Sequence, residues 1–136
     1  MIGNGLNKKS IAYVGNVAHL LKKLINEKTK GFQILNYTDE PDLTMNELVN
    51  LIYDYIGIKR NKIKIPYLAA LIIGYLFDVI ALIFKRDTKI SSIRVKKFCS
   101  NSIYDSRTSK IYFDPPYKLK DALRKTIKYE FLKSKK

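Results

Sequence analysis

Few side chains in this sequence have the types and spacing that catalysis requires. A tyrosine followed four residues later by a lysine would put a phenol and an ammonium on one helix face, and this occurs as Tyr55/Lys59 and Tyr129/Lys133. With 10 tyrosines and 21 lysines in 136 residues, chance alone produces about 1.5 such pairs. Gly57 also lies between Tyr55 and Lys59, where a helix should already have ended. Neither pair therefore indicates an active site, and we predict no catalytic residue in this chain.

The other reactive residue types are isolated. The carboxylates of Asp39, Glu40 and Asp42 cluster around a proline, which favours a solvated turn. His19 lies beside a leucine-rich helix face with no partner in the sequence pattern, and we interpret it as a packed or surface imidazole. Cys99 is a single cysteine and is interpreted as an inert thiol. One cysteine and one histidine exclude a disulfide framework and a cysteine-based zinc site, so no metal ligand is predicted.

The Gly3-Asn4-Gly5 segment has the composition of a phosphate-binding turn. A dinucleotide fingerprint also needs a preceding strand, a third glycine and a following helix. None of these is present, so the sequence predicts no cofactor-binding residue in this chain.

The elements around these residues follow from the hydrophobic pattern, which predicts a helix-rich α/β fold. Short strands are predicted at 11–14, 32–35, 63–65 and 101–104. Helices are predicted from residue 17, with Asn16 as N-cap, and from the Thr44/Glu47 capping box to Gly57. Further helices are predicted over 66–84 and over 90–98, the second with Ile90, Ile93 and Phe98 facing inward. A last helix follows Pro116, and its apolar stripe is Leu119, Leu123, Ile127 and Phe131.

The segment 65–84 has 17 apolar residues in 20 and is long enough to cross a bilayer. Asp78 within it, and the lack of a second such segment, speak against a span. We therefore favour a core or domain-interface helix, with contact to a membrane surface as the alternative.

The net charge of +14 is concentrated in the second half of the chain. Residues 1–58 carry six basic and six acidic groups, whereas 85–110 and 118–136 each carry eight basic and two acidic groups. Such a basic half indicates a phosphate-bearing partner, or simply a solvated lysine-rich surface. The residues alone leave open a phosphate-recognising part of a larger enzyme and, less well supported, a nucleic-acid-binding module. With one cysteine and no leader pattern, we expect a cytoplasmic protein.

The order of the segments resembles one enzyme family. GNGLNKKSIAYVGNVAHLL, GFQILNYTDEPDLTMNELVNLI, IPYLAALIIGYLFD and IYDSRTSKIYFDPPYKLKDALRKTIKYE are similar, in this order, to C-terminal segments of extended short-chain dehydrogenases/reductases. These are the NAD-dependent nucleotide-sugar epimerases and dehydratases. The match departs at Lys9, where the family has arginine, and at Arg107 and Tyr112 near the end.

The resemblance implies that residues 1–136 are the C-terminal, substrate-binding portion of a Rossmann-type enzyme whose N-terminal core is absent. Residues 17–35 would supply a helix and strand that complete the Rossmann sheet. Lys9 and Arg94 would meet the diphosphate of a nucleotide sugar, and NAD or NADP would bind the N-terminal part. The parent would be an epimerase, dehydratase or reductase, and without its other part this chain is expected to self-associate. The alternative function is a basic binding module for an anionic membrane surface or for nucleic acid. Of these two partners, nucleic acid is not expected, and a membrane surface would be contacted through residues 65–84.

The first prediction concerns catalysis by this chain alone. Hydride transfer needs a bound nicotinamide and an acid/base pair held against the substrate, and the sequence supplies neither. We expect the purified chain to bind neither NAD nor NADP in titration calorimetry and to turn over no sugar nucleotide. Micromolar binding of NAD would contradict this interpretation.

Overall fold

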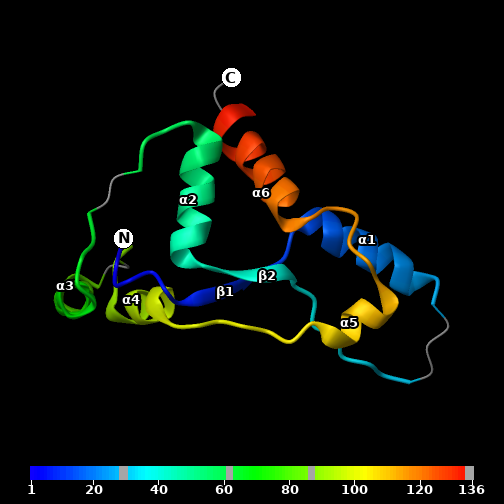
Figure 1. Ribbon diagram of the computed structural model, residues 1–136. Coiled ribbons are helices and arrows are strands. Elements are labelled where there is room, and N and C mark those ends of the chain that lie inside the picture. The colour runs from blue at the N-terminus through cyan, green and yellow to red at the C-terminus, as the bar shows by residue number, and fades with distance from the viewer. Residues whose placement is uncertain (28–30, 61–62, 86–87, 134–136) are drawn as a thin grey trace.

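The computed structural model describes residues 1–27, 31–60, 63–85 and 88–133. These ranges contain two short strands, separated by one helix, and then five helices in succession, the last of which continues into a π-helical turn (Figure 1). The elements are β1 (Lys8–Ile11), α1 (Val14–Ile25), β2 (Asp39–Thr44), α2 (Met45–Ile56), α3 (Tyr67–Phe84), α4 (Ser92–Cys99), α5 (Arg107–Tyr112), α6 (Leu119–Ile127) and the π-helical turn Lys128–Lys133.

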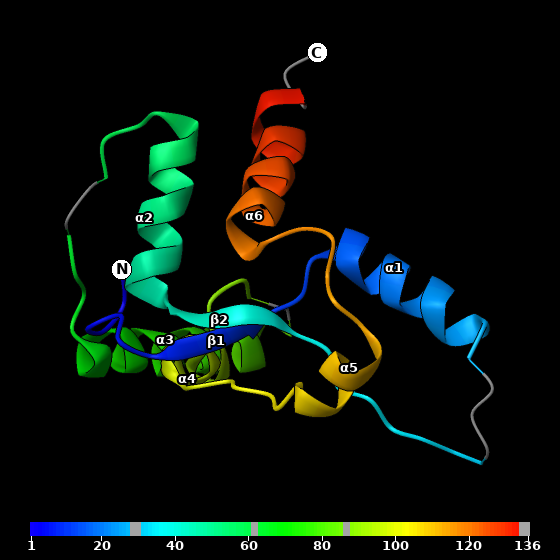
Figure 2. The ribbon, with the colours of Figure 1, turned by 45° about the vertical axis from the view of Figure 1, so that its right-hand side comes forward.

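The β1–β2 ribbon lies at the centre of the molecule. The strands are antiparallel, with Lys8 opposite Thr44 and Ile11 opposite Asp39, and a bulge lies between Lys9 and Ile11. Helices α2 and α6 stand on one side of the ribbon, and α3 and α4 lie on the other (Figure 2). Figures 1 and 2 place α1 and α5 together at the far end of the ribbon. The helix-rich α/β class predicted from the sequence is therefore observed.

The predicted strand positions are largely wrong. Residues 32–35 form no strand, and the side chains of Phe32 and Ile34 are 90% and 76% exposed. The second strand is instead 39–44, which the sequence had placed in a turn. A strand requires a hydrogen-bonding partner as well as apolar residues, and β1 provides that partner for 39–44. The predicted strands at 63–65 and 101–104 are reduced to single bridges, at Ile65 and at Ser102.

The helix predictions are closer to the structure. The capping box of α2 is confirmed, because the Thr44 hydroxyl accepts from the Glu47 N–H and the Glu47 carboxylate accepts from the Thr44 N–H at 2.8 Å. Gly57 ends this helix with a left-handed φ of 74°. Asn16 is not a cap, since α1 already begins at Val14.

The predicted helix over 90–98 is rotated in the structure. The helix covers Ser92–Cys99, and its inward residues are Ser92 and Val95. Ile93, predicted to face inward, is 63% exposed. The small Ser92 faces α3 because the two helices approach each other closely at that point.

Helix α3 packs on α4 through small residues. A Cβ on Gly74 would come within 2.8 Å of the backbone N and Cα of Ser92, so no larger residue fits there. The neighbouring turn contributes Ala70, which is 5% exposed. Asp78 accepts a hydrogen bond from the Ser92 N–H at 3.1 Å, so this carboxylate helps to cap α4. The charge that spoke against a membrane span therefore has a structural partner.

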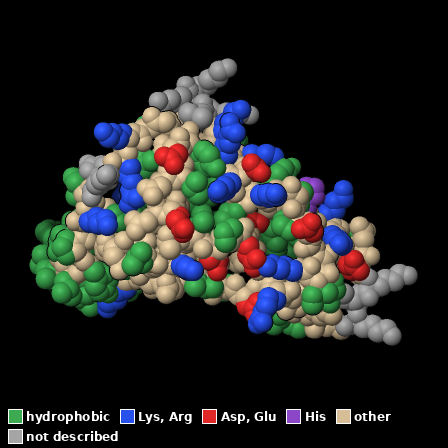
Figure 3. All heavy atoms as spheres, in the orientation of Figure 1, with side chains coloured by type: hydrophobic (Ala, Val, Ile, Leu, Met, Phe, Trp, Pro, Cys, Tyr) green, Lys and Arg blue, Asp and Glu red, His purple; other side chains and the backbone are tan. Residues whose placement is uncertain are grey.

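The remaining surface of α3 is exposed. Tyr67–Phe84 is a helix long and apolar enough to cross a membrane, and only 11% of it is buried in the described structure. Of the two favoured interpretations, a core helix is therefore not observed among the described residues, and a domain-interface helix stays a prediction. In the space-filling view, hydrophobic side chains gather at the end of the molecule where α3 lies (Figure 3).

The α3–α4 contact gives a second prediction. Gly74→Ala would normally favour a helix, but here the new methyl group overlaps the Ser92 backbone. We expect Gly74→Ala to lower the free energy of unfolding by about 1–3 kcal/mol in urea titrations followed by circular dichroism. The control is Ala69→Ser on the exposed side of α3, which should change it by less than about 0.5 kcal/mol. Stabilisation by Gly74→Ala would show that the helices do not touch there.

Candidate functional site

A buried carboxylate organises the end of the molecule where α1 meets β2. Asp39 is the first residue of β2 and is only 2% exposed. One of its oxygens accepts from the Asn16 amide at 2.7 Å and from the Tyr37 hydroxyl at 2.5 Å. The other accepts from the backbone N–H of Tyr13 at 2.6 Å. These donors offset the cost of removing the carboxylate from water.

Asn16 extends this network to the C-terminal part of the chain. It is fully buried, and its amide group also donates to the carbonyl of Tyr117 at 2.8 Å. Its side-chain oxygen accepts from the Tyr117 N–H at 3.1 Å. The Tyr117 ring packs edge-on against Tyr13, and the ammonium of Lys125 lies 3.6 Å from its centroid. Three distant segments are thus joined through one asparagine.

The polar network corrects two sequence interpretations. Asp39 does not lie in a solvated turn, and Asn16 is a buried bridge and not a helix cap. The interpretations failed because both residue types are most often found at turns and caps, whereas these two satisfy each other. The signal that could have found Asn16 is its place in the segment GNGLNKKSIAYVGNVAHLL, which carries part of the resemblance.

An open groove of about 910 Å³ adjoins this network. It is formed by 37–41, by Lys110 and by residues 113–115 and 117–121, and it contains both signs of charge. Lys110 makes an ion pair with Glu40 across it. Because its cations and anions are interspersed, the groove does not have the field of a dedicated phosphate site.

Of the two predicted ligand residues, Lys9 is bonded to α4 and Arg94 belongs to α4, and they differ in how many hydrogen-bond donors they have left for a ligand. The Lys9 ammonium donates to the carbonyl of Lys97 at 2.7 Å and to the Ser102 hydroxyl at 3.2 Å. Two of its three N–H donors are therefore engaged, so at most one remains for a ligand. Arg94 lies exposed in the first turn of α4, and its guanidinium donates to the Lys89 carbonyl at 2.8 Å. A guanidinium has five N–H donors, so Arg94 has more capacity left than Lys9.

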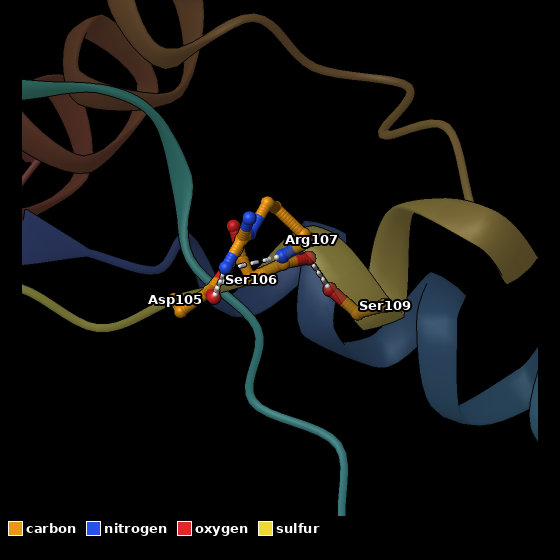
Figure 4. Close-up of polar contacts among 4 residues, drawn as sticks. All are labelled: Asp105, Ser106, Arg107 and Ser109. Atoms are coloured by element: carbon orange, nitrogen blue, oxygen red, sulfur yellow. Dashed lines mark hydrogen bonds and ion pairs between the residues drawn. The ribbon is translucent and has the colours of Figure 1, made fainter.

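Arg107, at the family-like Asp-Ser-Arg segment, is committed to its own neighbour. Figure 4 shows its guanidinium turned back onto Asp105, with N···O distances between 2.6 and 3.0 Å. These hydrogen bonds hold the pKa of Asp105 at about 2. Ser106 and Ser109 are buried, and the Ser109 hydroxyl donates to the Ser106 carbonyl at 2.7 Å. This segment therefore serves to start α5.

The turn at Gly3 and Gly5 has no room for a phosphate over Gly5. Both Gly3 and Gly5 have positive φ, as a phosphate-binding turn requires, but the Asn46 side chain fills the space over Gly5. A Cβ on Gly5 would lie 2.6 Å from the Asn46 oxygen. We therefore derive no catalytic step through NAD from this chain.

The other residues that the sequence analysis considered for catalysis make contacts that support the fold. The Tyr55 hydroxyl donates to the carbonyl of Lys120, and α2 has ended before Lys59. His19 is exposed and lies edge-on to Tyr117. Within the part of the chain that the structure describes, no cluster of three or more His, Cys, Asp or Glu side chains could hold a metal ion.

Comparison with known proteins supports the resemblance drawn from the motifs. No protein-family model matches this chain. A curated protein of Escherichia coli O157:H7, N-acetyl-alpha-D-glucosaminyl-diphospho-ditrans,octacis-undecaprenol 4-epimerase, is 37% identical over 139 residues. The alignment covers 100% of this chain and 41% of the relative, to whose C-terminal part this chain corresponds. The predicted similarity to the C-terminal part of an extended short-chain dehydrogenase/reductase is thereby confirmed.

The buried network gives a third prediction, on Tyr37. Partial burial and the Asp39 carboxylate raise the pKa of Tyr37 well above its usual value of 10. The protonated Tyr37 hydroxyl donates to Asp39 in the folded state, so the pKa of Tyr37 is higher in the folded protein than in the unfolded chain. The stability that this hydrogen bond contributes is therefore complete below pH 10 and is lost as the pH rises further. Tyr37→Phe should therefore lower the free energy of unfolding by about 1–2 kcal/mol at pH 7, and the difference from wild type should shrink above pH 10.

Urea unfolding between neutral and alkaline pH measures this effect. The matched control is Tyr129→Phe, since Tyr129 is 68% exposed. It should match wild type throughout. If the Tyr37→Phe protein is as stable as wild type at pH 7, the hydrogen bond from Tyr37 to Asp39 does not contribute to stability, and the prediction is wrong.

Proposed function

We propose that this chain, the C-terminal part of an extended short-chain dehydrogenase/reductase, provides the substrate-binding portion of an NAD(P)-dependent epimerase. The observation that carries the proposal is the similarity to an epimerase along the whole of this chain. The chain spans 41% of the length of that relative, so the activity of a complete enzyme is part of the proposal.

The proposed substrate is a sugar joined to a diphosphate. The relative is named for an N-acetylglucosaminyl diphosphate carried on undecaprenol, whereas the motifs of this chain resemble enzymes that act on nucleotide sugars. A sugar diphosphate is common to both substrate types. The experiment below determines whether the group on the other side of the diphosphate is a polyprenyl chain or a nucleoside.

Arg94 is the residue best placed to meet the diphosphate. It is exposed, it has unused donors, and a guanidinium can give two parallel charged hydrogen bonds to one phosphate. Lys9 would add a single donor, as a point charge fixed against α4. We therefore expect Arg94 to contribute most of the binding energy and Lys9 mainly to hold β1 on α4.

The cofactor and the catalytic residues would be supplied by the N-terminal Rossmann portion that such enzymes have. The apolar surface around 17–35 is the place where this portion would pack, because it exposes large hydrophobic side chains. These are Leu21, Ile25, Phe32 and Ile34, which are between 55% and 90% exposed. Such a surface also supports our expectation that this chain self-associates when the other portion is not bound. We place the enzyme in the cytoplasm.

A second function remains open for one specific reason. A basic binding module for an anionic membrane is favoured by the exposed apolar helix α3 together with the net charge of +14. Nucleic acid is not an expected partner, because the sequence has no nucleic-acid-binding pattern beside its charge.

The fourth prediction tests Arg94 in an active enzyme. The part of the Escherichia coli relative that precedes the matched region is fused to this chain, and epimerisation is followed by chromatography of the released sugar. Losing a charged hydrogen bond to phosphate costs about 1.5–3 kcal/mol, so Arg94→Ala should raise KM about 10- to 150-fold. The matched control is Arg124→Ala on the exposed side of α6, which should change KM less than about twofold.

The assay is run with UDP-N-acetylglucosamine and with N-acetylglucosaminyl-diphospho-undecaprenol. Turnover of one and not the other identifies the carrier group. Equal increases in KM for Arg94→Ala and Arg124→Ala would indicate diffuse electrostatic attraction. A folded fusion protein that converts neither compound would refute the proposed function.

A further inference from the structure

Helix α3 carries an aliphatic face with no partner in the described structure. Leu68, Ile72, Leu76, Val79 and Ile83 follow one another at spacings of three and four, which places them on one side of the helix. Each of these five side chains is between 54% and 70% exposed. We call them the aliphatic face. A continuous apolar surface of this kind marks a contact with another apolar phase.

The opposite side of α3 is fixed by its contact with α4. Gly74, near the middle of α3, touches the first residue of α4, and Asp78 accepts a hydrogen bond from the same residue. Helix α4 carries Arg94, Lys96 and Lys97. If α3 crossed a bilayer, this contact would draw these cations into the hydrocarbon, at a cost of about 2.5–3.5 kcal/mol each. A position in the plane of the surface avoids that cost.

Positive charge surrounds the aliphatic face on the side that would face the headgroups. Lys64 precedes α3 and Lys85 follows it, and both are exposed. Between them, the Lys96 ammonium donates to the Tyr75 hydroxyl at 2.9 Å, which holds an amphipathic ring and a cation together. Tyrosine and lysine are the residues typical of a membrane–water boundary.

We infer that α3 lies flat on an anionic phospholipid bilayer, with the aliphatic face in the acyl region and α4 on the aqueous side. Local charge favours this occupant over a second copy on the same face. A second copy packed there would bring the exposed lysines at the two ends of α3, Lys64 and Lys85, close to those of its partner, whereas anionic lipid neutralises them. The inference rests on the proposed function in one respect, since a sugar diphosphate carried on a polyprenol would have to be taken from such a surface.

Flotation with lipid vesicles tests this inference on the full chain. Vesicles of phosphatidylcholine with phosphatidylglycerol should carry the protein to the top of a density gradient, and vesicles of phosphatidylcholine alone should carry much less. Leu76→Asp should lower the partition coefficient at least about tenfold. The variant loses an aliphatic group that would enter the acyl region of the bilayer, and it adds a charge of the same sign as the lipid. Since Leu76 is 59% exposed, the fold should be unchanged by circular dichroism.

The matched control is Ile111→Asp on α5. Ile111 is 79% exposed and lies outside the aliphatic face, so the same change of charge should leave flotation within about twofold of wild type. The chain has no tryptophan, so a Leu76→Trp variant has one indole emitter, whose fluorescence should shift to the blue when anionic vesicles are added. A parallel loss of flotation in Leu76→Asp and Ile111→Asp would overturn the inference, as would an unshifted emission.

The vesicles contain no sugar diphosphate, so this test is independent of the proposed substrate. A wild-type chain that stays at the bottom of the gradient, while Arg94-dependent epimerisation is observed in the fusion protein, refutes the membrane contact alone. Sedimentation tests a second copy of the chain as the occupant. If wild type is a dimer that Leu76→Asp converts to monomer, and neither floats, the aliphatic face binds a second copy and the inference is wrong.

Discussion

The buried carboxylate of Asp39 is the constraint on which the rest of the structure depends. A charged group that is 2% exposed must be met by donors, and here they are three neutral groups from before α1, within α1 and before β2. Asn16 can serve Asp39 only because Tyr117 holds the amide in place from its other side. The position of α6 relative to α1 is thus set by hydrogen-bond geometry, and the apolar contacts form around it.

The strand β1 connects this network to the part of the molecule with proposed binding functions. Ile11 pairs with Asp39 at one end, and Lys9 reaches the C-terminal turn of α4. Helix α4 in turn carries Arg94 and holds α3 through Ser92. A sugar diphosphate bound at Arg94 would therefore lie close to the surface on which α3 rests. The two proposals, one for a ligand and one for a membrane, concern one structural unit.

The sequence predicted those elements whose determinants are local. The Thr44/Glu47 capping box, the stop at Gly57 and the length of the apolar helix depend on residues within one or two turns, and all three are observed. The strand at 39–44 and the role of Asn16 depend on partners 23 to 101 residues away, which local patterns do not contain. Arg94 and Lys9 came from the resemblance, and their different hydrogen-bonding freedom is visible only in three dimensions.

The long sequence separation of these hydrogen bonds also affects how the chain folds as it is synthesised. Helix α1 and strand β2 are synthesised before α6, and Asn16 receives its backbone partners only when Tyr117 has been translated, 101 residues later. A buried amide lacking those partners destabilises the enclosed state by about 1–3 kcal/mol. Helix α1 and strand β2 therefore stay open until the segment around Tyr117 has been made, with apolar helix surfaces available to proteins that bind nascent chains. Closure of the polar network depends on residues that are far from Asn16 in the sequence.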